Sequence, residues 1–469
     1  MSKINIAIPL YGKMAARALH QPMFRQELVN QGFKPLFFLN PTHLRLFDFD
    51  PSQYFGLNVE AYEKFDAEHF LLQQIRMLRR FVVRTETTDL RFREMIQSKL
   101  FDATLMGMSA QMTFVGVLRN IPNVGRLLEW LEGYFYTPKV HGSQFDALNI
   151  QCVLTPGMGN FGFWQEGSFA LEAQQRNIPS FAVITNYDNI VNMGYRGFTP
   201  ICLGVWSKQM ADEAMRLHGF SAKQLEITGP IQYDRYLHPL SVSRDEFLNS
   251  LGLDPAKKTI LFAGGVNINH YFDMYRVFVE QKTKVWRESF NLVVRPYPHV
   301  KLLGSPAWRV LERLFKDAGA YLSNPGSIDG SGDRNAELKL DLAFDDTIDE
   351  LACLLRYSDV MVNYFSTISL EAAICDLPVI HVGYDAFAHG QNFGVTSAFL
   401  QRQTHNSRQL RLSAARVVRN EADLFASLEA YLSDRALDQE ARRKYAESEC
   451  DILDGKSSER LVNMIRARL

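Results

Sequence analysis

Segment 358–384 contains the residues whose types and spacing point most clearly to chemistry. A short apolar stretch ends at Tyr364, and a polar run and an acid then open a predicted helix: Ser366, Thr367, Ser369 and Glu371. Free N–H groups at a helix N-terminus, together with hydroxyl groups, can bind a diphosphate, and a carboxylate there can accept the hydroxyls of a ribose. The pattern predicts a nucleotide site, although Glu371 taken alone is better explained by its effect on the helix dipole, about 0.3–1 kcal/mol.

Two other strand ends carry residues suited to the same ligand. Arg295 ends the apolar stretch 291–295, at the edge where α/β sheets bind ligands, and its guanidinium matches phosphate oxygens. His299 follows in the same proline-rich turn. Gly264 and Gly265 come after the first apolar stretch of the second half, where they allow a close ligand or simply a tight turn. A surface arginine in a stiff turn explains Arg295 equally well by itself.

The first half offers two carboxylates as catalytic candidates. Asp188 follows the apolar stretch 180–185, and Glu166 is expected in the loop after the stretch 150–154. A carboxylate delivered to the ligand-binding edge of a sheet can act as a general base toward a hydroxyl group. The alternative for Asp188 is an Asx turn, in which its carboxylate binds its own loop.

Two further motifs have weaker support. Residues 157–162 form G-x-G-x-x-G between a predicted strand and helix, the outline of an NAD(P)-binding loop, but the motif lies in mid-chain and directly follows Pro156. Asp48-Phe49-Asp50 resembles the D-x-D of metal-dependent transferases, although its proline-flanked position favours a surface turn. The histidines are not spaced as metal ligands. We therefore expect neither a metal nor a cofactor.

The elements that position these residues alternate between strand and helix. The first half has apolar stretches and intervening helical patterns, and the same alternation resumes in the second half, with the predicted strands at 4–9, 34–39, 150–154, 180–185, 201–206, 259–263, 291–295, 340–343, 360–364 and 379–382. Such alternation favours an α/β fold with doubly wound parallel sheets.

The alternation pauses once, which predicts two domains. We expect an N-terminal domain at 1–236, a polar linker at 237–258, and a C-terminal domain at 259–469 whose last helix is a candidate to pack back on the N-terminal domain. A helical insertion is expected at about 61–135. Its segment 76–99 carries seven basic and three acidic residues, which suits either contact with anionic lipid or an ordinary solvated helix face.

Composition excludes several classes of protein. The 469 residues are 46% hydrophobic and 22% charged, with a net charge of -1. This is the composition of a globular chain, and no basic excess indicates a nucleic-acid partner. The five scattered cysteines indicate reduced thiols and a cytoplasmic protein. The uncharged stretch 103–118 is shorter than the ~20 residues of a membrane-spanning helix, so any membrane contact is expected to be peripheral, at the inner face.

The order of the motifs resembles a known family. The second half, from about 259 to 469, resembles the donor-binding domain of GT-B glycosyltransferases, and especially the branch of CDP-glycerol glycerophosphotransferases and related surface-polysaccharide enzymes. Four segments carry the resemblance: RPYPH at 295–299, Asp349–Leu351 with Ser358–Asp359, STISLEAAICDLPVI at 366–380, and DGKSSERLVNMI at 454–465. Segments 185–197 and 205–236 match related proteins more loosely.

The resemblance implies a two-domain GT-B fold whose active site lies in the cleft between the domains. It implies that Glu371 holds the donor ribose, while Arg295, Ser366 and Thr367 contact its phosphates. Tyr297 stands where the family more often has histidine, which puts the role of His299 in doubt.

We therefore expect a metal-independent glycosyltransferase of surface polysaccharide synthesis. Its partners would be a nucleotide-sugar donor and a glycan or lipid-linked acceptor. Three alternatives share the fold: a nucleotide-sugar 2-epimerase, a CDP-alditol phosphotransferase, and a non-catalytic sugar-nucleotide-binding scaffold. Neither the donor nor the choice between inversion and retention follows from the sequence.

Overall fold

The computed structural model consists of two compact units. It describes residues 3–40, 52–97, 108–265, 267–280, 290–297, 300–323, 326–328, 338–340, 349–385 and 397–469. The first unit comprises residues 1–234 and 448–469, and the second unit comprises residues 235–447. The domain boundaries expected from the sequence stay a prediction.

The first unit contains a parallel sheet in the order β3-β2-β1-β4-β5-β6-β7. Its strands are β1 (Ile4–Leu10), β2 (Phe33–Leu39), β3 (Tyr54–Gly56), β4 (Cys152–Thr155), β5 (Ser180–Val183), β6 (Leu203–Val205) and β7 (Leu225–Ile227). The predicted strands at 4–9, 34–39, 150–154, 180–185 and 201–206 are confirmed. The strand order reverses between β1 and β4, where α/β sheets usually bind ligands.

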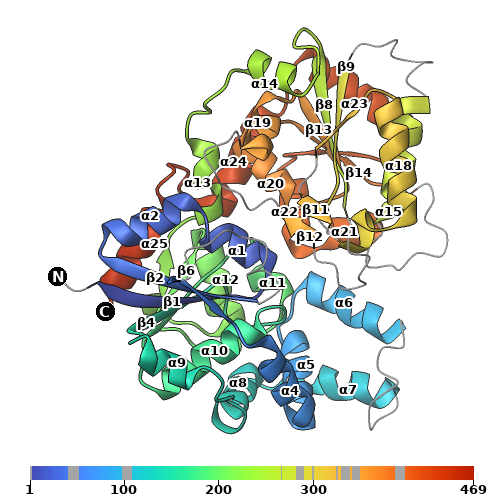
Figure 1. The fold of residues 1–469 in the computed structure, drawn as a ribbon. Coiled ribbons are helices and arrows are strands. Elements are labelled where there is room, and N and C mark those ends of the chain that lie inside the picture. The colour runs from blue at the N-terminus through green and yellow to red at the C-terminus, as the bar shows by residue number, and fades with distance from the viewer. Residues whose placement is uncertain are drawn as a thin grey trace. The chain divides into compact units, whose positions relative to one another are not determined.

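Helices cover both faces of this sheet (Figure 1). One face carries α9 (Gly142–Ala147) and α10 (Trp164–Gln175), and the other carries α1 (Lys13–Leu19), α2 (Pro22–Asn30) and α25 (Ser457–Arg466). Phe169 lies at the centre of one core, with its ring 4.9 Å from that of Phe38 and 4.8 Å from that of Phe145. The apolar residues of the strands thus find partners on both sides, as a parallel sheet requires.

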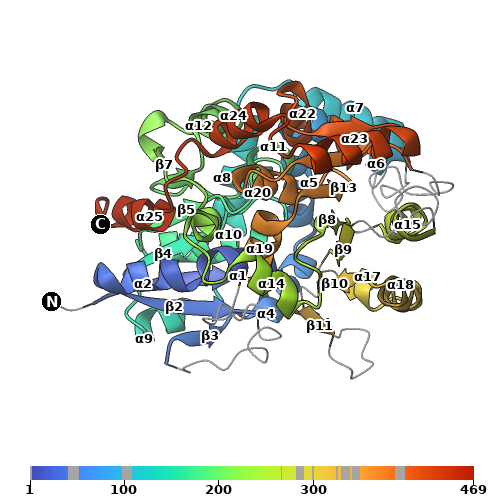
Figure 2. The ribbon, with the colours of Figure 1, turned by 90° about the horizontal axis from the view of Figure 1, so that it is seen from above.

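The C-terminal helix α25 belongs to the first unit. It lies beside α2 (Figure 2), and the buried carboxylate of Asp234 accepts hydrogen bonds from the N–H groups of Ser457 (3.0 Å) and Ser458 (2.8 Å). The Arg460 side chain donates to the carbonyl of Thr228 at 2.9 Å. These contacts join two segments, 205–236 and 454–465, that the sequence resemblance singled out separately.

Helices occupy most of the chain between β3 and β4: α4 (Val59–Glu68), α5 (Phe70–Val82), α6 (Glu86–Gln97), α7 (Met108–Leu118) and α8 (Val124–Phe135). The basic residues of 76–99 do not form one exposed face, because the side chain of Arg79 is only 3% exposed and ion-pairs with buried Glu132 of α8 at 2.7 Å. Arg76 pairs with the same carboxylate at 2.8 Å. No helix among the described residues combines the length and apolarity that crossing a bilayer requires.

The second unit contains a parallel sheet in the order β10-β9-β8-β13-β14-β15. Its strands are β8 (Lys258–Ala263), β9 (Phe290–Arg295), β10 (Tyr321–Leu322), β13 (Val360–Asn363), β14 (Val379–Val382) and β15 (Arg416–Val418). The predicted strand at 340–343 is wrong as a member of this sheet. Leu340 ends β12 (Leu338–Leu340), which pairs antiparallel with β11 (Gly326–Ile328), and residues 341–343 lie outside the described residues.

Figure 1 shows α15 (Ile268–Tyr275) and α18 (Pro306–Asp317) on one side of the second sheet and α19 (Glu350–Tyr357) and α20 (Ile368–Ile374) on the other. The core beneath α15 and α18 contains Phe262, Tyr271 and Trp308. Each unit thus has its own parallel sheet and its own core, which confirms the predicted fold of two parallel α/β sheets.

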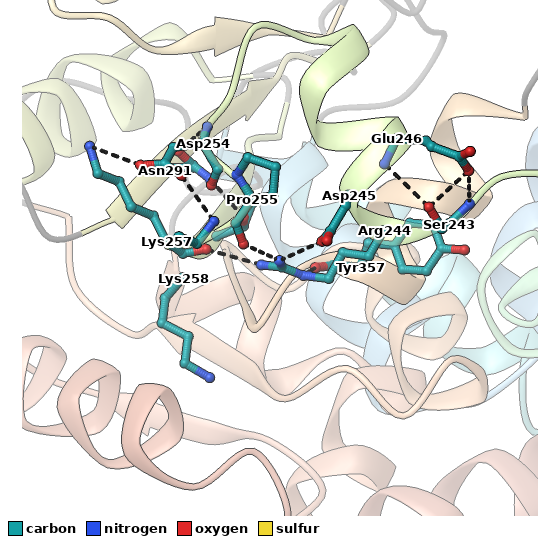
Figure 3. Close-up of polar contacts among 12 residues, drawn as sticks. Ser243, Arg244, Asp245, Glu246, Asp254, Pro255, Lys257, Lys258, Asn291 and Tyr357 are labelled. Carbon is teal, nitrogen blue, oxygen red and sulfur yellow. Dashed lines mark hydrogen bonds and ion pairs between the residues drawn. The ribbon is translucent and has the colours of Figure 1, made fainter.

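The segment expected as a linker, 237–258, is bound to the second unit. It contains α14 (Arg244–Ser250), which begins with a capping box between Ser243 and Glu246. The Arg244 guanidinium donates to the carbonyls of Pro255 at 2.6 Å, Lys257 at 3.0 Å and Tyr357 at 3.3 Å (Figure 3). One side chain therefore holds both ends of this segment against α19.

Candidate functional site

The carboxyl edge around β8 brings the predicted donor residues together. Strand order reverses between β8 and β13, and Ala263 lies opposite both Arg295 of β9 and Asn363 of β13. The chain therefore leaves all three strands at the same edge, into the segments that contain Gly264, Gly265, Ser366 and Thr367. Residue His299 lies outside the described residues.

The two glycines after β8 differ in their surroundings. A Cβ on Gly264 would lie 2.2 Å from the ring of buried Tyr271, whereas a Cβ on Gly265 would meet no atom of the described residues within 4 Å. The Tyr271 hydroxyl donates to the Gly265 carbonyl at 3.0 Å and accepts from the N–H of Tyr297 at 2.9 Å. Packing of Tyr271 explains Gly264, while Gly265 leaves open space in front of its backbone.

Arg295 already has partners in the second unit. Its guanidinium donates to the hydroxyl of Ser323 at 2.5 Å and lies 3.6 Å from a carboxylate oxygen of Glu350. Tyr321 donates to the same carboxylate at 3.2 Å. A phosphate group at Arg295 would therefore compete with Glu350 for the guanidinium.

The segment between β13 and α20 is held in an uncommon backbone conformation. Phe365 has φ of +51°, in the left-handed region that bulky residues rarely adopt, and its ring stacks on His381 at 4.3 Å. Its N–H donates to Nδ1 of His381, and burial lowers the pKa of His381 to about 4, so the ring is neutral and can accept. The hydroxyl of Ser369 donates to the Ser366 carbonyl and accepts from Asn363.

These contacts give the residues of the predicted phosphate site different roles. The hydroxyl of Ser369 is engaged inside the segment, where it positions the start of α20. Ser366 and Thr367 are partly exposed at the same helix start. They are the hydroxyl residues best placed to contact a ligand.

Glu371 has a partner that the sequence did not reveal. Glu371 is 6% exposed, and its carboxylate accepts a hydrogen bond from the hydroxyl of Tyr236. Arg356 donates to the Tyr236 carbonyl, and Arg235 forms an ion pair with Asp349 at 3.0 Å. The Asp-Arg-Tyr sequence at 234–236 was the available signal, but its partners lie more than a hundred residues away in the chain.

A buried aromatic and acidic cluster beside this edge was also missed. The rings of His270 and Tyr364 stack with centroids 3.5 Å apart, and Nε2 of His270 lies 3.1 Å from Asp385. Burial lowers the pKa of His270, an effect that the hydrogen bond to Asp385 opposes. Asp385 also accepts from the N–H of Ser397 at 2.9 Å. These residues come from separate elements, so no local pattern could have connected them.

Glu166 lies in the first turn of α10 and not in the expected loop, near the point where the strand order of the first sheet reverses. Its buried carboxylate accepts a hydrogen bond at 3.0 Å from the N–H of Tyr11, the residue that follows β1. Burial raises the pKa of Glu166 to about 7, and the N–H groups of Tyr11 and Gly12 oppose the rise. A carboxyl group that titrates near neutrality can both take up and release a proton at physiological pH.

Asp188 precedes the short helix α11 (Asn189–Asn192) and is 6% exposed. One carboxylate oxygen accepts from the side-chain amide of Asn192 at 2.8 Å. The other is buried without a hydrogen-bond partner among the described residues. The residue thus has the local contacts of a turn and also one oxygen that a ligand hydroxyl could satisfy.

Close packing explains Gly159, the second glycine of the G-x-G-x-x-G motif. A Cβ on Gly167 would lie 2.6 Å from the Cα of Gly159, and a Cβ on Gly197 would lie 2.2 Å from the Gly159 carbonyl oxygen. The backbone at Gly159 is therefore enclosed by protein. The D-x-D at 48–50 lies outside the described residues. Within the described ranges, no three His, Cys, Asp or Glu side chains are grouped as metal ligands would be.

Comparisons with known proteins agree with this architecture. Residues 340–467 match the model of the CDP-glycerol:poly(glycerophosphate) glycerophosphotransferase family. No curated protein sequence is significantly similar to the chain.

Two solved structures illustrate the similarity of fold. UDP-GlcNAc 2-epimerase from Neisseria meningitidis, solved with bound UDP-GlcNAc, has a TM-score of 0.51 and 10% identity, over 99% of this chain and 100% of that one. The epimerase from Methanocaldococcus jannaschii, in complex with UDP-GlcNAc and UDP, has a TM-score of 0.52 and 11% identity, over the same shares of the two chains. The chain thus has the predicted GT-B fold, and its C-terminal part resembles the CDP-glycerol glycerophosphotransferases.

Proposed function

We propose that this protein is a glycosyltransferase of surface polysaccharide synthesis, which moves a sugar from a nucleotide-activated donor to a glycan or lipid-linked acceptor. The observation that carries the proposal is the convergence of Gly265, Arg295, Ser366 and Thr367 on the edge where the strand order of the second sheet reverses. Hydroxyl groups, a guanidinium and open backbone together suit a nucleoside diphosphate. Glu371 would accept the ribose hydroxyls.

A CDP-alditol phosphotransferase is the second candidate, favoured by the family match over residues 340–467. Both reactions release a negatively charged nucleotide, and Arg295 would stabilise the charge that develops on its phosphate. The epimerase remains a third alternative because the two solved relatives share the fold. An epimerase changes its donor without an acceptor, whereas either transferase requires one.

Calorimetric titration with CDP, CDP-glycerol, UDP, UDP-GlcNAc and GDP tests the donor site. We expect one nucleotide class to bind and Glu371→Gln to weaken that binding about 10-fold or more, because a hydrogen bond to a charged group is lost. Glu459→Gln is the matched control, since it removes an exposed first-turn acid from α25. Equal nucleotide affinity in wild type and Glu371→Gln would refute the ribose assignment.

Turnover with the bound donor then identifies the base. The neutral-range pKa of Glu166 supports it in this role, and the unsatisfied oxygen supports Asp188. Loss of a general base lowers turnover about 10²–10⁴-fold, so Glu166→Gln and Asp188→Asn are compared at saturating donor. If both variants keep normal turnover with unchanged donor affinity, neither residue is the base and a retaining mechanism is favoured.

We also propose that the protein is cytoplasmic and contacts the inner face of the membrane peripherally. The surface that supports this is α8, which exposes Leu127, Trp130, Tyr134 and Phe135. Tryptophan and tyrosine are the residues most enriched at membrane interfaces.

A further inference from the structure

A cavity in the first unit is lined by arginines and aromatic rings. It lies between α5 and the segment that leads into α10, and its volume is about 230 Å³, whereas one water molecule needs only about 10–15 Å³. Its wall includes Arg76, Arg79, Arg80, Asn160, Phe161 and Trp164. The cavity is therefore large enough for a small organic molecule.

Two of the three arginines are neutralised by acids of the same unit. Arg76 forms ion pairs with Asp66 at 2.6 Å and with Glu132 at 2.8 Å, and Arg79 pairs with Glu132 at 2.7 Å. Arg79 also donates to the carbonyls of Gly159 and Tyr195. These contacts hold α5 against the neighbouring segments and occupy the carboxylates of Asp66 and Glu132.

Arg80 differs from the other two arginines because neither Asp66 nor Glu132 forms an ion pair with it. Its guanidinium stacks on the ring of Phe161 at 3.8 Å, and it has no hydrogen bond or ion pair with any residue that the structure describes. Burial and the nearby Arg91 lower the pKa of Arg80 to about 10, an effect that the nearby Glu94 opposes, so Arg80 stays protonated at neutral pH. A partly buried cation without an acceptor, at the wall of a cavity, suits an anionic ligand.

A second polar group in the wall is also unsatisfied. Asn160 is 1% exposed, and its amide nitrogen donates to the carbonyl of Asn189 at 3.2 Å. Its amide oxygen has no hydrogen-bond partner among the described residues. This oxygen can only accept, so it suits a hydroxyl group. The rings of Phe161 and Trp164 add an apolar wall, with Arg76 stacked 4.3 Å above the Trp164 ring.

We propose that this cavity binds a hydroxylated organic phosphate of the size of a sugar or alditol phosphate. The phosphate would bind Arg80, a hydroxyl would donate to Asn160, and the carbon skeleton would lie along Phe161 and Trp164. That this molecule is part of the acceptor rests on the proposed function. That the cavity binds it does not, because binding to the first unit needs no donor.

Calorimetric titration of the full chain without donor tests the site. The probes are glycerol 3-phosphate, a short glycerol phosphate oligomer, and uncharged glycerol. We expect at least one phosphate probe to bind and Arg80→Gln to weaken it about 10-fold or more, because a charged hydrogen bond is lost. Arg93→Gln, which removes an exposed arginine from α6, should bind like wild type, and Asn160→Leu should weaken the same probe.

The outcomes separate the possibilities. Binding of glycerol 3-phosphate that depends on Arg80 supports a site for a free small molecule, and Arg80-dependent binding of the oligomer alone supports a site for the end of a polymer. No binding of either phosphate, or equal affinity in wild type and Arg80→Gln, overturns the proposal. Loss of donor binding in Glu371→Gln with this site intact would concern the proposed donor site alone.

Discussion

The two neighbouring glycines after β8 have different surroundings among the described residues. Gly264 faces the ring of Tyr271, and a Cβ there would lie at 2.2 Å, whereas Gly265 has open space. We expect Gly264→Ala to lower the free energy of unfolding by about 1–3 kcal/mol, the usual cost of overpacking. Gly265→Ala should leave stability within about 0.5 kcal/mol but obstruct a ligand. Urea unfolding compares the two variants, and equal losses would contradict the packing argument.

Glu166 makes stability depend on pH. Its pKa of about 7 in the folded protein lies above the ordinary glutamate pKa of 4.5, so the folded state binds the proton more tightly. This contribution is fully present below pH of about 4.5 and is lost as pH rises through about 7. As pH rises from about 4.5 to about 7, we expect the free energy of unfolding of the wild type to fall by up to about 3 kcal/mol relative to that of Glu166→Gln. Urea unfolding of both proteins at pH 5 and pH 7.5 measures this change. The same difference in unfolding free energy at both pH values would contradict the raised pKa of Glu166.

At the scale of elements, α8 exposes an aromatic face. Trp130 and Tyr134 are 55% and 68% exposed, and their rings stack with centroids 5.4 Å apart. We expect the wild-type protein to sediment with anionic liposomes at low salt and the Trp130→Ser, Tyr134→Ser double variant to stay in the supernatant, because interfacial rings are lost. Phe114→Ser is the control, because it also removes an exposed apolar side chain, but from α7 rather than from α8. Equal recovery of wild type with and without liposomes would refute membrane contact.

The elements were predictable where apolar stretches were long. Strands such as β1, β8 and β14 are apolar and bounded by turn residues, so the sequence predicted them. β7 and β15 each have three residues, and such short strands show no recognisable alternation of apolar and polar residues. The end of β9 likewise placed Arg295 at the edge where the strand order of the second sheet reverses.

Contacts between distant residues could not be predicted. The hydrogen bond from Tyr236 to Glu371 and the stacking of Arg80 on Phe161 join segments that only the tertiary fold brings together. The left-handed backbone at Phe365 contradicts local propensity, and it persists because stacking and a hydrogen bond to His381 stabilise it. The sequence therefore indicated which sheet edge each candidate site occupies. Only the packing of the fold shows which side chains there have no partner in the protein and can contact a ligand.

At the scale of the whole molecule, Asp234 joins distant parts of the first unit. Its carboxylate caps α25 through Ser457 and Ser458, and loss of such a cap costs about 0.5–2 kcal/mol. We expect Asp234→Ala to speed amide exchange in α25 while leaving exchange in β13 unchanged. Hydrogen exchange followed by mass spectrometry measures both, with exposed Asp245→Ala as control. Unchanged exchange in α25 would show that the cap contributes little.

The return of α25 to the first unit also imposes an order on biosynthesis. Residues 235–447 lie between the two segments of the first unit, so a ribosome that adds about 5–20 residues per second completes them first. After the first segment of the first unit has been synthesised, roughly 10–40 s pass before α25 emerges. During that interval the apolar surface of α2 that α25 covers is available to chaperones, and a pause in translation within the second unit would prolong the exposure.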